Sequence, residues 1–366
     1  MRLCTDRCAD PVAEGIERYV GLEHLEPNDL RIRSWGLVAN GVTFTTRFKS
    51  GQVLFGKRRA YQRKVAIAEF AGVCSGDIYV FEPSSGRLLP GLLPYVCQSE
   101  AFFEHALKTS AGSLSPRTNW NSLADFEFAI APLDEQQRLV AALTTRSTAL
   151  EAHRELCRTL DVARSALVEA WIQDSGRSAR LARLGDVSDI AYGLTVDATR
   201  RTLREQRPYL RVANVQRGAL DLSEVKSIGF DQSDSKCVLK PNDVLVVEGH
   251  ASATEIGRAA QWNDEVPGAL HQNHLIRVRA GGQLDPEYVT IALNSSLGRK
   301  HFQAAAKSTS GLYTINSSVV KAFMIPLESL PAQRQLVASF NALSRAADAS
   351  ASRRSKLAEW ELLHVQ

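Results

Sequence analysis

The chain has 366 residues, of which 44% are hydrophobic and 23% charged, and its formal net charge is +4. This composition is typical of a globular protein, and the length excludes a single ordinary domain in favour of two or three. No run of 18 apolar residues is present, so the sequence predicts no transmembrane helix and no membrane partner.

The N-terminus, MRLCTDRCADPV, is polar and lacks the apolar core of a signal peptide, so we expect a cytoplasmic protein. Six cysteines are scattered along the chain without the pattern of a disulfide framework, which favours reduced thiols. Cys4 and Cys8 have no second pair nearby, so no metal site is expected there.

Residues 1–130 contain short apolar runs that are typical of strands, such as GVTFTTRF, QVLFG and GDIYVF, separated by Gly, Pro and Asn. A helical stretch, YVCQSEAFFEHAL, follows them. We therefore predict a first α/β domain over residues 1–130. The run GQVLFGKR resembles a phosphate-binding loop, but Arg58 stands where Ser or Thr is required, so nucleotide binding is not expected.

A basic stretch runs through this first domain. Nine Lys or Arg and no Asp or Glu lie between Leu30 and Ala68. Phosphates attract such a segment, although a solvated surface would give the same pattern. The DNA-binding candidates of the first domain are Lys57, Arg58, Arg59, Tyr61, Gln62, Arg63, Lys64, Lys108 and Arg117.

Residues 131–175 predict a long helix, since no Gly or Pro interrupts the chain after Pro132. Its apolar residues recur every three or four positions, as in a coiled coil, with Arg146 and others interrupting the seam. The candidates for helix pairing and partner binding here are Leu139, Leu143 and Leu150.

After an expected linker at 176–183, residues 184–326 predict a second α/β domain with strand-like runs such as DVLVV and HLIRVR. Arginines cluster near its start, and further bases follow Arg299. The DNA-binding candidates of this domain are Arg200, Arg201, Arg204, Lys307, Tyr313 and Asn316. Tyr and Asn are included as readers of base edges. His271 and His274 have no third ligand at a useful spacing, so no metal site is expected.

Residues 327–366 predict a second long helix, whose seam candidates are Leu336, Phe340 and Leu343. Two readings stay open for the helices. Each could lie on the core of its own domain, or the two could form an antiparallel pair that spaces the domains.

The chain contains an internal repeat. At an offset of 197 residues Gln136 aligns with Gln333, and Asn119 with Asn316. Further back a gap shifts the offset to about 190, where Tyr19 aligns with Tyr209. Met1 then aligns near Ala191, so we expect the first copy to lack the LGDVSDI opening of the second. Such a long unit indicates a duplicated domain rather than a solenoid.

The order of segments resembles the specificity subunit of type I restriction–modification systems. The resemblance rests on PLDEQQRLV and LPAQRQLV at the helix starts, on LGDVSDIAYG, and on SAGSLSPRTNW and KSTSGLYTIN upstream of each helix. It implies a mixed α+β fold class: two α/β target-recognition domains in a pseudo-twofold repeat, joined by two long antiparallel coiled-coil helices. It also implies a phage-defence function, in which each domain reads one half of a split site on double-stranded DNA.

The same resemblance implies a non-catalytic chain that binds no cofactor. Its partners would be two methyltransferase subunits, which use S-adenosylmethionine for adenine methylation, and a restriction and translocase subunit, which uses ATP and Mg²⁺. Three alternatives remain: a coiled-coil scaffold that ignores DNA, a specificity component of another methylation or phage-defence system, and a nuclease with an unrecognised active site.

Overall fold

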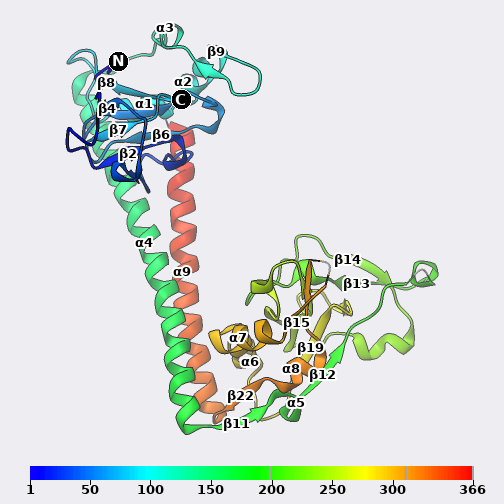
Figure 1. Ribbon diagram of the computed structural model, residues 1–366. Coiled ribbons are helices and arrows are strands. Elements are labelled where there is room, and N and C mark those ends of the chain that lie inside the picture. Colours follow the sequence, from blue (N-terminus) through cyan, green and yellow to red (C-terminus); the bar gives the residue numbers. More distant parts are fainter. Residues whose placement is uncertain (198, 310, 365–366) are drawn as a thin grey trace. The chain divides into compact units, whose positions relative to one another are not determined.

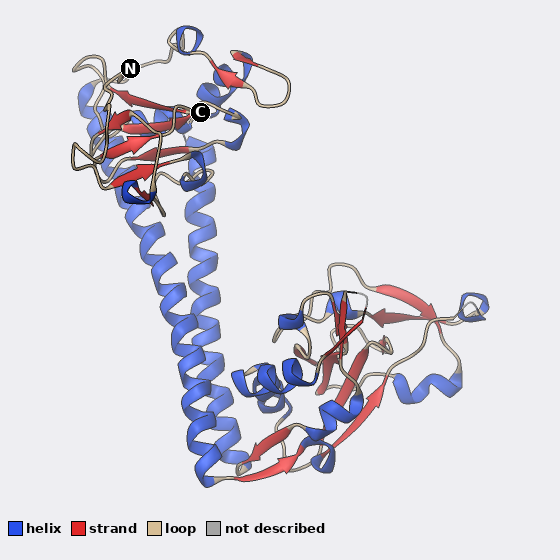
Figure 2. Ribbon diagram, viewed as in Figure 1, coloured by secondary structure: helices blue, strands red, loops and turns tan. Residues whose placement is uncertain are grey.

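The structure is a computed structural model that describes residues 1–197, 199–309 and 311–364, without the side chains of 176–178, 199, 201, 309 and 359–364. Two compact units make up the chain (Figures 1 and 2). Unit 1 is Met1–His153 with Ser352–Gln366, and unit 2 is Arg154–Ala351. The long helices α4 (Leu133–Ser178) and α9 (Leu330–His364) each contribute residues to both units.

Unit 1 contains two four-stranded sheets. The first has the antiparallel order β1-β8-β5-β6, and the second has the order β3-β2-β7-β4, in which β2 runs parallel to β7. The strands are β1 (Arg2–Leu3), β2 (Arg18–Val20), β3 (Gly36–Leu37), β4 (Thr46–Phe48), β5 (Val53–Gly56), β6 (Val65–Ile67), β7 (Gly72–Cys74) and β8 (Ile78–Glu82).

Helices and a hairpin complete unit 1. They are η1 (Leu22–His24), η2 (Val38–Asn40), η3 (Ala60–Gln62), α1 (Leu93–Gln98), α2 (Glu100–Lys108), the strands β9 (Ser110–Ala111) and β10 (Arg117–Thr118), and α3 (Trp120–Leu123). All four residues of β5 are buried, and Val53 and Phe55 pack with Phe102 and Phe103 of α2 in one core. Strand β5 is therefore apolar without alternation because both of its faces are covered.

Unit 2 repeats this plan. Its four-stranded sheet has the order β12-β19-β15-β17, and its second sheet, β14-β13-β18, again contains a parallel pair. The strands are β12 (Ser188–Tyr192), β13 (Gln206–Leu210), β14 (Lys226–Gly229), β15 (Asp243–Val247), β17 (Ala259–Trp262), β18 (Leu270–His271) and β19 (Leu275–Ala280). Tyr19 pairs with Val73 in unit 1 as Tyr209 pairs with Leu270 in unit 2.

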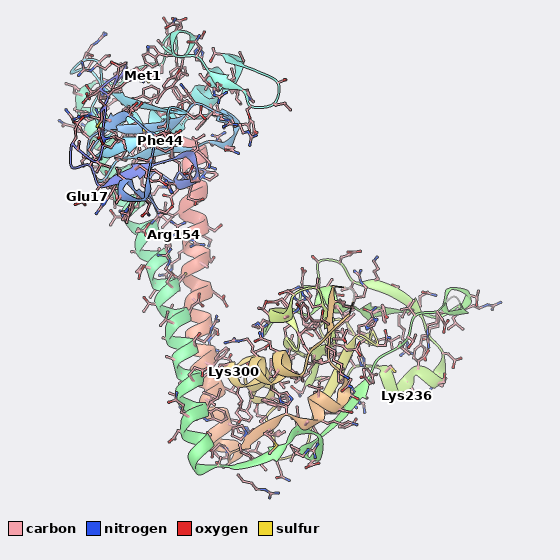
Figure 3. All side chains as sticks on the ribbon, in the orientation of Figure 1. Met1, Glu17, Phe44, Arg154, Lys236 and Lys300 are labelled. Carbon is pink, nitrogen blue, oxygen red and sulfur yellow. The ribbon has the colours of Figure 1, made fainter. Side chains whose placement is uncertain are left out.

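Further helices and short strands complete the domain of unit 2. They are η4 (Thr199–Thr202), η5 (Val212–Asn214), η6 (Gln232–Cys237), β16 (Gly249–His250), η7 (Ala253–Glu255), α6 (Pro286–Asn294), α7 (Ser296–Ala305), the hairpin β20 (Lys307–Thr309) and β21 (Leu312–Thr314), and α8 (Ser317–Ala322). Figure 3 draws the side chains, with Lys236 marking η6 and Lys300 marking α7. The α6–α7 pair follows the sheet as α1–α2 does, with Ser295 and Ser99 as the N-caps of the second helices.

The expected linker at 176–183 is wrong. Helix α4 continues to Ser178, and β11 (Arg180–Arg183) then pairs with β22 (Met324–Leu327) before the one-turn helix α5 (Leu184–Val187). The backbone groups that a linker would leave to water are used in this two-stranded ladder. The segment just before α9 is thereby joined to the segment just after α4.

A buried glutamine at the start of each long helix explains why Gln136 and Gln333 align in the repeat. The Nε2 atom of Gln136 donates to the carbonyls of Arg87 and Ala131, at 2.7 and 2.9 Å, and its Oε1 accepts from the backbone of Leu89. Gln333 makes the same three bonds, to Gln283, Glu328 and Asp285. Each glutamine fixes the start of its long helix to the loop that precedes the first short helix of its domain.

The two long helices pair antiparallel within each unit. In unit 2, Cys157 of α4 donates to the carbonyl of Ala347, and the guanidinium of Arg164 lies 5.5 Å from the ring of Phe340. In unit 1, Arg146 is buried and donates to the carbonyl of Leu357 at 2.7 Å. Because Arg146 bonds across the pair, it is part of the helix contact rather than an interruption of the seam.

In unit 2 the two helices pair with each other, α9 packs on the core of its own domain, and the second half of α4, which follows the first domain, packs on that same core. Leu336 of α9 and Val168 of α4 belong to the main core of this unit, and Phe340 packs against that core. The seam prediction is wrong for Leu139, which is 37% exposed, whereas Leu143 is 1% exposed. Leu150 and Leu343 are half-buried.

Candidate nucleic-acid interface

The loop after β5 in unit 1 lies against the β9–β10 hairpin, about 55 residues later in the chain. The amide of Arg59 donates to the carbonyl of Pro116 at 2.7 Å, and the amide of Thr118 donates to the carbonyl of Lys57 at 2.9 Å. Arg58 and Arg117 face each other in an antiparallel bridge. Two segments that the sequence separates thus form one surface, which we call the hairpin site.

The charges of the hairpin site are unbalanced. Asp77 accepts from Arg117 at 2.8 Å and from Arg58 at 3.4 Å. Burial alone would raise the pKa of Asp77, but the hydrogen bonds from the two arginines outweigh it and hold that pKa below its usual value. With Lys57 and Arg59 included, the hairpin site contains four cationic side chains and one carboxylate, so it keeps positive charge.

Three of these cations also contact groups other than a carboxylate. Lys57 lies 4.5 Å from the centre of the Tyr79 ring, and burial lowers the pKa of its ammonium. Arg58 and Arg59 both donate to the hydroxyl of Ser115 at 3.1 Å. The Nε atoms of Arg58 and Arg59 are buried without a partner in the described part of the chain. Such unpaired buried donors are uncommon in folded proteins.

Backbone strain is concentrated in the same loop. Arg59 and Arg63 have φ values of 55° and 54°, the left-handed region that non-glycine residues seldom adopt. They flank η3, which presents Tyr61 at the surface and Gln62 half-buried beside it. Strained positions of this kind cost about 1 kcal/mol or more each and cluster at binding sites.

The rest of the basic stretch is not the open cationic face that we expected. Arg63 pairs with Glu100 at 2.7 Å, and Lys64 donates to the carbonyl of Leu22. Arg33 pairs with Asp29 and Glu151, and Arg47 pairs with Glu14. These acids lie outside the run from Leu30 to Ala68, which is why the run by itself suggested a segregation of charge. Lys108 lies apart on α2, where it pairs with Glu104.

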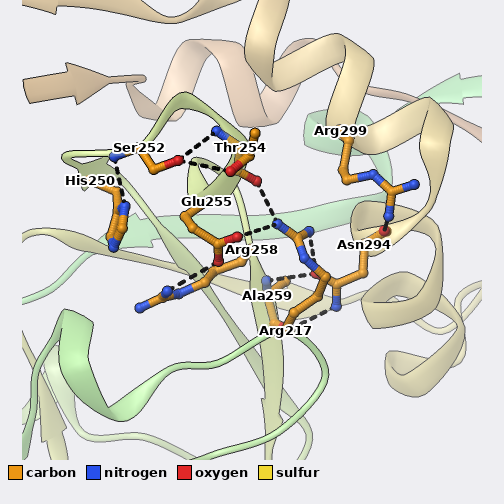
Figure 4. Close-up of polar contacts among 9 residues, drawn as sticks. All are labelled: Arg217, His250, Ser252, Thr254, Glu255, Arg258, Ala259, Asn294 and Arg299. Carbon is orange, nitrogen blue, oxygen red and sulfur yellow. Dashed lines mark hydrogen bonds and ion pairs between the residues drawn. The ribbon is translucent and has the colours of Figure 1, made fainter. Parts of the chain in front are cut away.

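In unit 2 the same topological place has a different chemistry. The connection from β15 to β17 lies against the β20–β21 hairpin, where His250 pairs with Tyr313 as Arg58 does with Arg117. His250 accepts from the amide of Ser252 at 2.9 Å, and the amide of Thr254 donates to the hydroxyl of Ser252 (Figure 4). Small polar residues therefore replace the arginines of unit 1.

A polar network holds the β15–β17 connection against α6 and the loop that contains Arg217. Asn294 at the end of α6 exchanges two hydrogen bonds with the backbone of Ala259, and Arg217 donates to the carbonyl of Thr254 at 2.7 Å (Figure 4). Burial, with repulsion from Arg299 and Arg258, lowers the pKa of Arg217 against the attraction of Glu255. The sequence did not single out Asn294.

The structure revises several candidates of unit 2. Arg200 makes two bonds to Asp234, at 2.6 and 2.9 Å, and its side chain is only 17% exposed, so it stabilises η4 against η6. Asn316 accepts from the amide of Val319 as the N-cap of α8, which is also the role of Asn119 before α3. Arg204 and Lys307 are exposed. The side chain of Arg201 lies outside the described residues.

Sequence reasoning missed the two residues that organise the hairpin site, Asp77 and Ser115. Asp77 was visible only as a single acid in the run CSGDIYVF, at the start of a strand. Ser115 carried no signal of its own. Their roles depend on pairing between distant segments, which a local pattern does not contain.

Comparison with known proteins shows that the chain is similar in sequence to specificity subunits of type I restriction enzymes. A stretch of 131 residues is 30% identical to the type I restriction enzyme EcoDI specificity subunit of Escherichia coli, and covers 33% of this chain and 28% of that protein. A stretch of 296 residues is 23% identical to the EcoKI specificity subunit of Escherichia coli strain K12, and covers 73% of this chain and 63% of that protein. The matches thus span less than two thirds of each relative.

Solved structures show the same fold. The S subunit of a type I restriction–modification system from M. genitalium matches with a TM-score of 0.60 at 12% identity, over 100% of this chain and 92% of that one. A chain from a type I system, solved in a study of complex assembly and conformational transition, matches with a TM-score of 0.58 at 19% identity, over 99% and 94%. No family model matches the chain.

These findings confirm the resemblance to type I specificity subunits and the mixed α and β fold class with two long helices. In the part of the chain that the structure describes, no helix is both long and apolar enough to cross a bilayer.

Proposed function

We propose that the chain is a DNA-binding specificity subunit of a type I restriction–modification complex, in which each domain reads one half of a split site. The observation that carries this proposal is the duplication. The first four-stranded sheet has the same strand order in both domains, and each domain is fixed to its own long helix by an equivalent buried glutamine. A protein that reads two half-sites needs two such readers, and the relatives carry the name of specificity subunits.

The difference between the two hairpins supports independent reading. The unit 1 hairpin contacts Lys57, Arg58 and Arg59, whereas the unit 2 hairpin contacts a connection whose side chains are mostly small. Arginine forks read guanine edges, and hydroxyl groups bond to several bases, so the two sites would prefer different sequences.

In the complex, the chain itself would perform no chemistry. Adenine methylation would belong to two methyltransferase subunits with S-adenosylmethionine, and cleavage to a restriction and translocase subunit with ATP and Mg²⁺. The paired helices would bind the methyltransferase subunits. Leu139 of α4 is exposed and is therefore available to such a partner.

Salt dependence of DNA binding tests the proposal. The purified chain should bind duplex DNA with an affinity that falls steeply as salt rises, because phosphate contacts release counterions. Changing Arg58, Arg59 and Arg117 to Ala should weaken binding. It should also reduce the slope of log K against log salt by about 0.9 for each phosphate that the variant no longer neutralises.

Arg138 provides the control, since it is an exposed arginine of unit 1 that pairs with Asp134 of α4 rather than with the hairpin site. Its replacement by Ala should leave the slope unchanged. If the chain bound no DNA at low salt but still bound a methyltransferase subunit, the scaffold alternative would hold. Magnesium-dependent cutting by the chain alone would instead indicate a nuclease.

A further inference from the structure

The tip of the β9–β10 hairpin carries a leucine that the proposed function does not yet use. Leu114 is 91% exposed, on a loop that projects from the body of unit 1 (Figure 1). Single exposed leucines are common on protein surfaces, so exposure alone is no argument. What distinguishes Leu114 is the way in which the surrounding residues hold it.

The loop on which Leu114 lies is braced on one side. The hydroxyl of the next residue, Ser115, accepts from both Arg58 and Arg59, and the carbonyl of Pro116 accepts from the amide of Arg59. On the other side, Gly112 takes a φ of 109°, which side chains rarely allow. The apolar side chain is therefore held on a constrained turn rather than on a free loop.

The neighbours of Leu114 indicate its partner. Gly112, Ser113 and Ser115 are small and keep the tip narrow, while the base of the hairpin carries the excess positive charge around Asp77. A narrow apolar tip on a cationic base is complementary to a polyanion that contains apolar stacked surfaces. Duplex DNA has this combination: phosphates outside and base pairs inside. Proteins that kink DNA use leucine in this way.

We infer that Leu114 is a wedge that inserts between adjacent base pairs while Arg58, Arg59 and Arg117 hold the flanking phosphates. The inference rests on the proposed function, because it requires that unit 1 bind duplex DNA. It adds that unit 1 deforms its half of the site, so that the ease of unstacking a base step contributes to recognition.

A topology assay tests the wedge without knowledge of the target. The full chain is incubated with closed circular plasmid DNA and a relaxing topoisomerase, and the topoisomers are separated after removal of the protein. Insertion of a side chain unwinds DNA, so the wild-type chain should shift the topoisomer distribution. Leu114→Ser should abolish the shift and weaken retention of the plasmid on a filter by about tenfold, or about 1.4 kcal/mol.

Two further variants complete the experiment. Leu114→Phe should keep the shift, since a phenylalanine also unstacks base pairs. Leu107→Ser, which changes another exposed leucine on α2, should leave the topoisomer shift and the filter retention as in the wild type.

Two outcomes would overturn the wedge and leave the proposed function standing. One is plasmid retention by the wild-type chain without a topoisomer shift, and the other is an unchanged shift with Leu114→Ser. A Leu114→Ser chain that keeps its DNA shift but no longer binds a methyltransferase subunit would make the tip a protein contact. Failure of the wild-type chain to retain DNA at all would overturn the proposed function itself.

Discussion

At the scale of single residues, His271 links the stability of unit 2 to pH. The side chain lies on β18 and is fully buried, with Nδ1 3.1 Å from the carbonyl oxygen of Cys237. Burial lowers the pKa of His271 to about 4, because the charged imidazolium would lose its water. The folded protein therefore holds the neutral ring at pH values where the unfolded chain has already bound a proton.

We predict that the free energy of unfolding of unit 2 falls as the pH drops from about 6.5 to about 4. When folding lowers the pKa of a basic group, the protein loses stability as the pH falls, because the unfolded state binds more protons in that pH window. The full loss should be about 3 kcal/mol. Urea unfolding at a series of pH values measures this free energy when it is monitored by hydrogen exchange of peptides from residues 154–351.

His271→Gln serves as the test variant, since it keeps a polar group at this site but does not titrate. It should be less stable at pH 7 and show a flatter dependence between pH 6.5 and 5. Carboxylates with lowered pKa, such as Asp234, act only at more acidic values. A pH profile of His271→Gln as steep as that of the wild type would mean that another group causes the effect.

At the scale of elements, the start of helix α4 separates two leucines that look equivalent in the sequence. Leu139 and Leu143 are four residues apart on one helical face, yet Leu139 is exposed and Leu143 is buried. Leu143→Ala should lower the free energy of unfolding of unit 1 by about 2–5 kcal/mol, because it removes packed methyl groups and leaves a cavity.

The matched control is Leu139→Ala, which should change that free energy by less than about 0.5 kcal/mol. Hydrogen exchange of peptides from residues 1–153 in urea measures the free energy of unfolding of unit 1 in both variants. Equal losses in the two variants would show that the apolar seam extends to Leu139. A stable Leu139→Asp chain that no longer binds a methyltransferase subunit would instead support a docking role for this residue.

At the scale of the whole molecule, the duplication predicts modular recognition. If residues 1–130 are replaced by the corresponding domain of a relative with another target, one half of the methylated site should change and the other half should remain. The graft must supply the carbonyl of residue 87 and the amide of residue 89, because Gln136 bonds to both. Methylome sequencing of a host with the hybrid and its methyltransferase reads the result. A change in both halves at once would show that the domains do not read independently.

Much of the organisation of this protein could be read from its sequence, because it depends on local and repeated patterns. The long helices follow from uninterrupted 3- and 4-residue spacing, and the strands of the buried sheets from short apolar runs between turn residues. The duplication was visible because equivalent positions make the same hydrogen bonds and so carry the same residue type. Gln136 and Gln333 bond to equivalent loops of the two domains, and Asn119 and Asn316 cap equivalent short helices.

The electrostatics of the surface were decided only by the tertiary structure. A cluster of basic residues along the sequence does not show which acids folding brings beside it. Arg200, for example, pairs with Asp234, and Arg63 pairs with Glu100. An excess of positive charge remains at the hairpin site, where residues 57–59 meet residues 115–117 through backbone bonds between distant segments. Coulomb energy depends on distance in space, and separation along the chain does not determine that distance.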